Sequence, residues 1–149
     1  MPTGPLRPLL VGLLACALVA GPGAADEQQR PTRKVIYTAL TILQVESAIF
    51  NKPIQYRLHR SPARAIKHFN DVDACTTELL FHSGEPVRID WRAVTSVAVK
   101  DEAVALVGTR VTFTAVVPDQ PRKLGRVLNF LIEECVSPVI ESPNPGPGG

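Results

Sequence analysis

The residues best suited to chemistry lie in a basic stretch between positions 57 and 68. It reads Arg57-Leu-His-Arg-Ser-Pro-Ala-Arg-Ala-Ile-Lys-His68 and holds no acidic residue. The planar guanidinium of arginine matches the oxygens of phosphate and carboxylate groups, so such a stretch can hold an anion. On a helix, the spacing of its second half would align Arg64, Lys67 and His68 on one face. We predict an anion-binding or partner-binding site formed by Arg57, Arg60, Arg64 and Lys67.

Charge is distributed unevenly along the chain. Residues 30–68 carry eight arginines and lysines against one acid, Glu46, whereas residues 69–149 carry seven basic and eleven acidic residues. A basic half of this kind is typical of a surface for an anionic ligand or an acidic protein. Nucleic acid is not the expected partner, because the stretch lacks interleaved aromatic side chains on which bases stack. Ordinary solvated surface charge is the alternative interpretation.

Catalytic chemistry has weaker support in the sequence. His59, His68 and His82 lie near Asp71 and Asp73 in the chain, and together they could hold a divalent metal in a small secreted hydrolase. Their spacing matches no pattern that fixes two imidazoles on one helix face. Gly-x-Ser-x-Gly and glycine-rich phosphate loops are absent. We therefore expect a non-enzymatic binding module without a cofactor, with the metal-dependent hydrolase or a structural component of an envelope assembly as alternatives.

The N-terminal segment predicts export to the periplasm or the extracellular space. Arg7 precedes an apolar run over residues 8–20, and Gly21-Pro-Gly-Ala-Ala25 follows it. This order is typical of a signal peptide over residues 1–25, cleaved between Ala25 and Asp26. The run is short for a transmembrane span, which needs roughly 20 residues. A lipoprotein signal ending at Cys16 is the less favoured alternative.

Cleavage after Ala25 would leave Cys75 and Cys135 in an oxidising compartment. An even pair of cysteines in a secreted chain indicates a disulfide, with two free thiols as the alternative. Two cysteines this far apart in sequence form neither a zinc site nor a Cys-x-x-Cys redox motif, so a structural role is favoured.

Composition divides the rest of the chain into three parts. Residues 26–33 are polar and read as a flexible leader, and residues 34–136 read as a single domain. Residues 137–149 are rich in proline and glycine and cannot bury enough apolar surface to become ordered, so a disordered tail is expected.

The first part of the domain can be read in two ways. Residues 35–50 are rich in β-branched side chains and a turn follows at Asn51-Lys-Pro53, which favours a strand pair with residues 54–58; a helix over 35–49 is the alternative. Ser61-Pro62 has the residue types of a helix start, which predicts a short mid-chain helix to about Asn70.

The second part follows a clearer pattern. Short β-prone runs alternate with turn signals, which predicts strands over 76–81, 87–91, 95–99, 103–107 and 111–116. Leu124, Leu128 and Leu131 then recur at helical spacing, so an amphipathic helix from about 119 to 135 should cover the sheet. The lone Trp91 reads as a core anchor rather than a ligand contact.

The predicted fold class is therefore α+β, an antiparallel β-meander of about six or seven short strands closed by a C-terminal amphipathic helix. This outline resembles that of pleckstrin-homology-like barrels, which also end a meander with one helix. The resemblance concerns shape alone, because many unrelated small domains share the outline.

Overall fold

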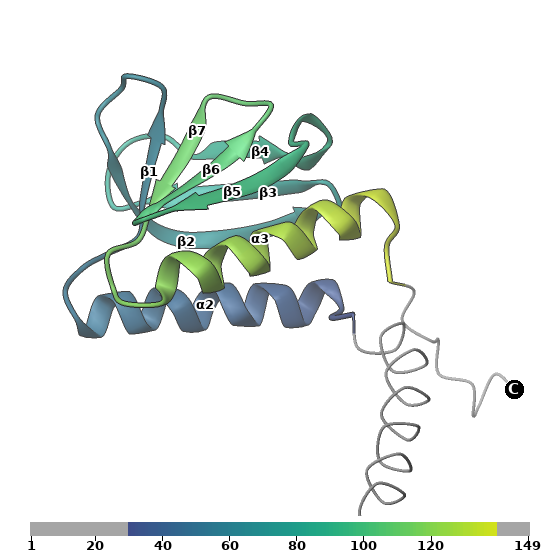
Figure 1. Ribbon diagram of the computed structural model, residues 1–149, viewed down its shortest axis with the longest axis horizontal. Coiled ribbons are helices and arrows are strands. Elements are labelled where there is room, and N and C mark those ends of the chain that lie inside the picture. The colour runs from purple at the N-terminus through teal and green to yellow at the C-terminus, as the bar shows by residue number, and fades with distance from the viewer. Residues whose placement is uncertain (1–29, 140–149) are drawn as a thin grey trace, which may run out of the picture. The chain divides into compact units, whose positions relative to one another are not determined.

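Seven antiparallel strands and two long helices make up the part of the chain that the computed structural model describes, residues 30–139 (Figure 1). The predicted signal peptide, residues 26–29 of the predicted leader and residues 140–149 of the predicted tail lie outside the described residues. The elements are α2 (Arg33–Ile49), β1 (Gln55–Leu58), β2 (Arg64–Asp73), β3 (Thr76–Phe81), β4 (Val87–Asp90), the 3-10 turn η1 (Trp91–Ala93), β5 (Ser96–Lys100), β6 (Ala103–Val107), β7 (Val111–Thr114) and α3 (Gln120–Val136). Within residues 30–139, no helix is long and apolar enough to cross a membrane.

The sheet consists of two meanders that meet at the first strand. Its order is β4-β3-β2-β1-β7-β6-β5, so β1 pairs with both β2 and β7, and β4 and β5 lie at opposite edges. The antiparallel α+β prediction is confirmed, and the predicted strands from residue 76 onward match β3 to β7 within a few residues. The chain crosses from one edge to the other after β4, through η1.

Residues 33–49 form a helix, so the favoured strand-pair interpretation of this segment was wrong. The Thr32 hydroxyl caps the helix by accepting a hydrogen bond from the Val35 amide at 3.4 Å. Ile36, Leu40 and Leu43 are buried at helical spacing, and this packing outweighs the β-propensity of the segment. The helix begins at Arg33, one residue before the predicted domain boundary at residue 34.

Residues 64–73 form strand β2, so the short helix predicted over 61–70 was also wrong. His59 adopts a positive φ of 50°, and the Ser61 amide donates to the Leu58 carbonyl at 2.9 Å, so the chain turns tightly here. The turn returns the chain along β1, with Gln55 opposite Ala65. Ser61 and Pro62 thus belong to a hairpin loop, and serine and proline are as common in turns as at helix starts.

The two helices lie side by side, run in opposite directions and cover one side of the sheet (Figure 1). The predicted C-terminal helix is confirmed as α3, with Leu124, Leu128 and Leu131 at most 1% exposed. In β7, Val111 and Phe113 are buried on one face of the strand. The core therefore lies between the helices and the strands.

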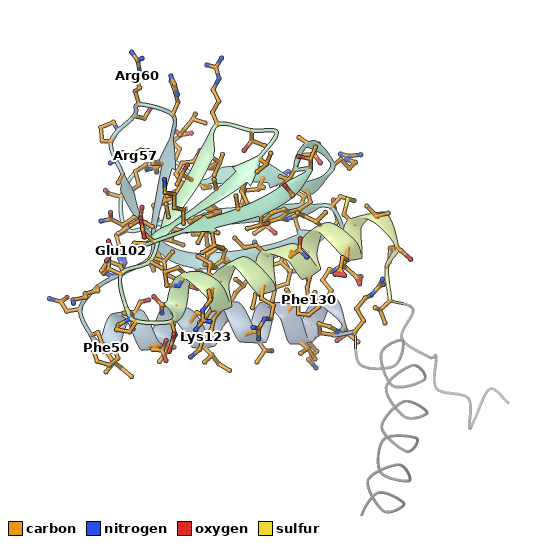
Figure 2. All side chains as sticks on the ribbon, viewed as in Figure 1. Phe50, Arg57, Arg60, Glu102, Lys123 and Phe130 are labelled. Atoms are coloured by element: carbon orange, nitrogen blue, oxygen red, sulfur yellow. A yellow bond between two sulfur atoms is a disulfide. The ribbon has the colours of Figure 1, made fainter. Side chains whose placement is uncertain are left out.

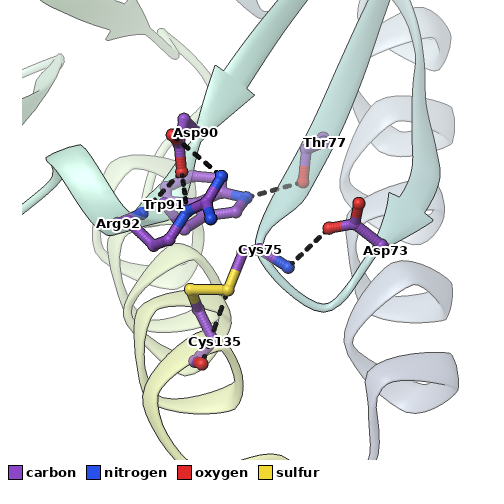
Figure 3. The surroundings of a disulfide bond; sticks show 7 residues. All are labelled: Asp73, Cys75, Thr77, Asp90, Trp91, Arg92 and Cys135. Atoms are coloured by element: carbon purple, nitrogen blue, oxygen red, sulfur yellow. Dashed lines mark hydrogen bonds and ion pairs between the residues drawn. A yellow bond between two sulfur atoms is a disulfide. The ribbon is translucent and has the colours of Figure 1, made fainter.

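A disulfide joins Cys75, at the β2–β3 turn, to Cys135 near the end of α3, as the sequence predicted (Figure 3). Beside it, the Asp73 carboxylate accepts a hydrogen bond from the Cys75 amide at 2.9 Å, which lowers the pKa of that carboxyl. The Trp91 amide donates to the Cys75 carbonyl at 2.8 Å, so the same turn also holds η1.

Trp91 is a core anchor, as predicted, with 2% of its surface exposed. Its indole Nε1 donates to the Thr77 hydroxyl at 2.7 Å (Figure 3), and the same hydroxyl is hydrogen bonded to the Tyr37 hydroxyl of α2. One threonine side chain thus links η1, β3 and α2.

Burial of Tyr37 makes the stability of the domain sensitive to alkaline pH. Burial raises the pKa of Tyr37 from 10.0 to about 12, because the ionised phenolate loses its hydration. The Tyr37 hydroxyl therefore holds its proton more tightly in the folded state than in the unfolded state. We expect the free energy of unfolding to keep its full value below pH 10 and to fall as the pH rises towards 12. Denaturant unfolding across this range tests the prediction. Burial also raises the pKa of Tyr56, so Tyr37→Phe should remove only part of the decline, and an unchanged decline in that variant would contradict the assignment.

Candidate binding surface

Two loops bring exposed arginines together at one end of the sheet. Arg57 lies at the end of β1 and Arg60 in the loop that follows, while Arg110 lies just before β7. The His59 amide donates to the Arg110 carbonyl at 2.8 Å, and Leu58 lies opposite Val111, so the two loops are joined through their backbones. We call Arg57, Arg60 and Arg110 the basic end; Figure 2 shows its first two members on one side of the domain.

The charges of the basic end have no acidic partner among residues 30–139. The ion pairs in this part of the chain instead involve Arg33, Arg88, Arg92 and Arg122. Neither of the two loops contains an acidic residue. The backbone pairing of β1 with β7 holds both loops in place, so a negatively charged group would meet arginines that are already positioned.

Arg64, the third predicted site residue, supports the β3–β4 turn. Its guanidinium lies 3.6 Å from the centre of the Phe81 ring and donates to the Ser83 and Glu85 carbonyls at 3.2 and 2.7 Å. It thereby fastens the β3–β4 turn against β2. Arg64 also lines a hollow of about 440 Å³ beside the β1–β2 loop, together with Tyr56, Leu58, Ser61, Pro62 and Val87.

Lys67 and Arg64 line different hollows. The predicted helical alignment of Arg64, Lys67 and His68 was wrong, because these residues belong to strand β2 and a bulge interrupts its register between Ile66 and His68. Lys67 and His68 instead line a hollow of about 250 Å³ between α2 and the sheet, with His82 on its wall and Ile54 and Ile66 among its apolar residues. The predicted four-residue site therefore separates into two places.

The histidines and aspartates considered for a metal are not brought together as one group, since His68 and His82 line the same hollow but no aspartate does. His59 lies in the β1–β2 loop, while His68, Asp71 and Asp73 are spread along β2. Asp71 accepts a hydrogen bond from the Arg33 side chain at 3.0 Å, and Asp73 accepts one from the Cys75 amide. In the described part of the chain, no three His, Cys, Asp or Glu side chains are grouped so that they could hold a metal ion.

Arg110 was missed in the sequence because it stands alone between two strands. The nearness of Arg110 to Arg57 depends on the pairing of β1 with β7. No local pattern reports a pairing between segments so far apart in the chain.

Comparison with known proteins gives one limited structural similarity. No family model matches the chain, and no curated protein matches it in sequence. Among solved structures, the solution structure of the N-terminal PH domain of human ARAP2 is similar over 62% of this chain and 86% of that chain, with a TM-score of 0.40 and 14% sequence identity. A likeness of this extent carries no information about function.

Proposed function

We propose that the chain is an exported, non-enzymatic binding module that holds an anionic ligand or an acidic protein surface at its basic end. The observation that carries this proposal is the joining of two arginine-bearing loops by the hydrogen bond from the His59 amide to the Arg110 carbonyl. Each of the three arginines is exposed and unpaired within residues 30–139, so an incoming anion displaces no acid. Exposed charges act within about 8–10 Å at ordinary ionic strength, so binding should weaken as salt is added.

Charge reversal at the basic end should abolish most of the binding. We expect Arg60→Glu combined with Arg110→Glu to weaken retention on immobilised heparin or immobilised polyglutamate, with a loss of about tenfold in affinity at low salt. Both side chains are exposed, and Arg64 is left in place because it supports the β3–β4 turn. The salt concentration at which each variant elutes is the measurement.

The matched control carries the same change in net charge elsewhere. Lys100→Glu combined with Arg126→Glu alters two exposed residues on β5 and α3. This control should elute close to the unaltered protein, and equal losses in both double variants would mean that only net charge matters and would overturn the proposal. Selective retention on heparin would indicate an anionic glycan or similar ligand, and selective retention on polyglutamate an acidic protein surface.

A further inference from the structure

The outer face of α2 is an exposed apolar stripe. Its members are five large apolar residues that are each more than half exposed, with Ile42 at 61% and Ile49 at 75%: Val35, Ile42, Val45, Ile49 and Phe50. They recur at helical spacing, and Val35, Ile42 and Ile49 are seven residues apart. Large exposed apolar patches on a domain mark a surface that contacts another protein, a membrane or a ligand. We call these five residues the α2 stripe.

Lysines surround the α2 stripe. Lys34 precedes it, Lys52 follows it, and Lys67 lines the hollow that Val45 also lines. Figure 2 shows Lys123 of α3 beside α2, on the same side of the domain as Phe50. Lysines therefore lie at both ends of the stripe and on either side of it.

Acids also lie near the stripe, and each of them accepts a hydrogen bond. Glu134, which lines a hollow with Lys34, accepts one from the Val139 amide at 2.9 Å, and Asp119 at the start of α3 accepts one from the Arg122 side chain at 2.8 Å. The Glu46 carboxylate accepts a hydrogen bond from the Gln120 amide of α3 at 3.3 Å, and the Asp71 carboxylate accepts one from the Arg33 side chain at 3.0 Å. A second copy of the chain placed on the stripe would set lysines against lysines, which disfavours self-association. The charge pattern instead matches a negatively charged partner.

The shape of the stripe points to a flat partner. It follows one straight helix from Val35 to Ile49, a distance of about 21 Å at the helical rise per residue. The inner side of α2 packs on the core, so its outer apolar side with flanking lysines is free to lie in the plane of a bilayer interface, with the lysines reaching the phosphate groups. We propose that α2 docks this domain onto the surface of an anionic lipid bilayer, with the α2 stripe in the interface.

This surface is distinct from the basic end. Figure 2 places Phe50 and Arg60 on opposite sides of the domain, so a domain lying on its α2 stripe presents Arg60 to the solution. A bilayer and a soluble anionic partner could therefore be bound at the same time.

Vesicle sedimentation tests the proposal with the whole chain as recovered from its host. We expect binding to vesicles of equimolar phosphatidylglycerol and phosphatidylcholine, and much weaker binding to phosphatidylcholine alone. Ile42→Gln combined with Ile49→Gln should lower the affinity by tenfold or more, roughly what the loss of two partly buried isoleucines implies. All variants share the same N-terminal segment, so the difference between them isolates α2.

Two control variants assign the result to one surface. Leu58→Gln combined with Val107→Gln changes two exposed apolar residues on β1 and β6, and it should bind like the unaltered protein. Arg60→Glu combined with Arg110→Glu should retain most of the vesicle binding while losing heparin or polyglutamate. Far-UV circular dichroism of each variant confirms that it is folded.

Three results would overturn the bilayer proposal. The first is no binding to the anionic vesicles, and the second is binding that the two isoleucine changes leave intact. The third is a dimer in lipid-free buffer, seen by sedimentation equilibrium, that the isoleucine changes dissociate, because a second copy would then occupy the stripe.

Discussion

Removal of the Cys75–Cys135 disulfide is expected to lower the free energy of unfolding by about 4 kcal/mol. The bond closes a loop of 60 residues, and a cross-link of that length removes about this much chain entropy from the unfolded state. The loop contains β3 to β7 and most of α3, so the constraint acts on most of the sheet. Urea unfolding of a Cys75→Ala, Cys135→Ala double variant, followed by the fluorescence of the single tryptophan, measures the loss.

Chemical reduction provides the control for this experiment. The unaltered protein in excess dithiothreitol should unfold at the same urea concentration as the double alanine variant, because both lack only the cross-link. If the free energy of unfolding falls by less than about 1 kcal/mol in both the reduced protein and the double alanine variant, the disulfide does not restrain the unfolded chain.

Trp91→Ala is expected to destabilise the domain by about 3–5 kcal/mol. The indole is almost fully buried, so its removal leaves a large cavity between η1, β3 and the core. The change also deprives the Thr77 hydroxyl of the Trp91 Nε1 donor, although Tyr37 remains bonded to it. Urea unfolding followed by circular dichroism measures the effect, since the variant has no tryptophan.

Thr77→Val separates the hydrogen bonds from the packing. Valine has nearly the shape of threonine but no hydroxyl, so the indole N–H and the Tyr37 hydroxyl would both lose their partner. We expect about 1–3 kcal/mol for each buried polar group that is left unpaired. A Thr77→Val variant as stable as the unaltered protein would contradict the bridging assignment and would leave Trp91 with a packing role alone.

The sequence predicted best where local pattern and tertiary packing agree. Strands β4 and β7 alternate apolar and polar side chains because one face of the sheet is covered, and α3 repeats leucines every three or four residues for the same reason. The pairing of Cys75 with Cys135 followed from there being two cysteines in the predicted mature chain.

The errors lie where local propensity and packing disagree. Residues 33–49 are rich in β-branched side chains, but Val35, Ile42, Val45 and Ile49 lie on the exposed side of α2, while Ile36, Leu40 and Leu43 carry its packing. The β-branched residues that favoured a strand in the sequence are thus largely the members of the α2 stripe. The exposed β-branched residues of α2 favour neither the helix nor its packing, so the fold alone does not explain them.

The candidate site could be predicted only in part for a different reason. Arg57 and Arg60 are neighbours in sequence and remain neighbours in the structure, whereas Lys67 is carried away by the hairpin and Arg110 is brought in by β7. Which charges share a surface is decided by strand pairing across the sheet, which composition does not report.

The position of β1 in the middle of the sheet has a consequence for how the chain acquires its structure. Gln55 pairs with Thr114, so the central strand of a chain synthesised from its N-terminus has only one of its two neighbours until residue 114 has emerged. The β1 to β4 segment can pair early through local contacts, but the join to β7 has a high contact order and should form late. We therefore expect the last step of folding to be closure of the β1–β7 seam, which also assembles the basic end. A ribosome-bound chain that stops before residue 111 would lack both the β1–β7 pairing and the basic end.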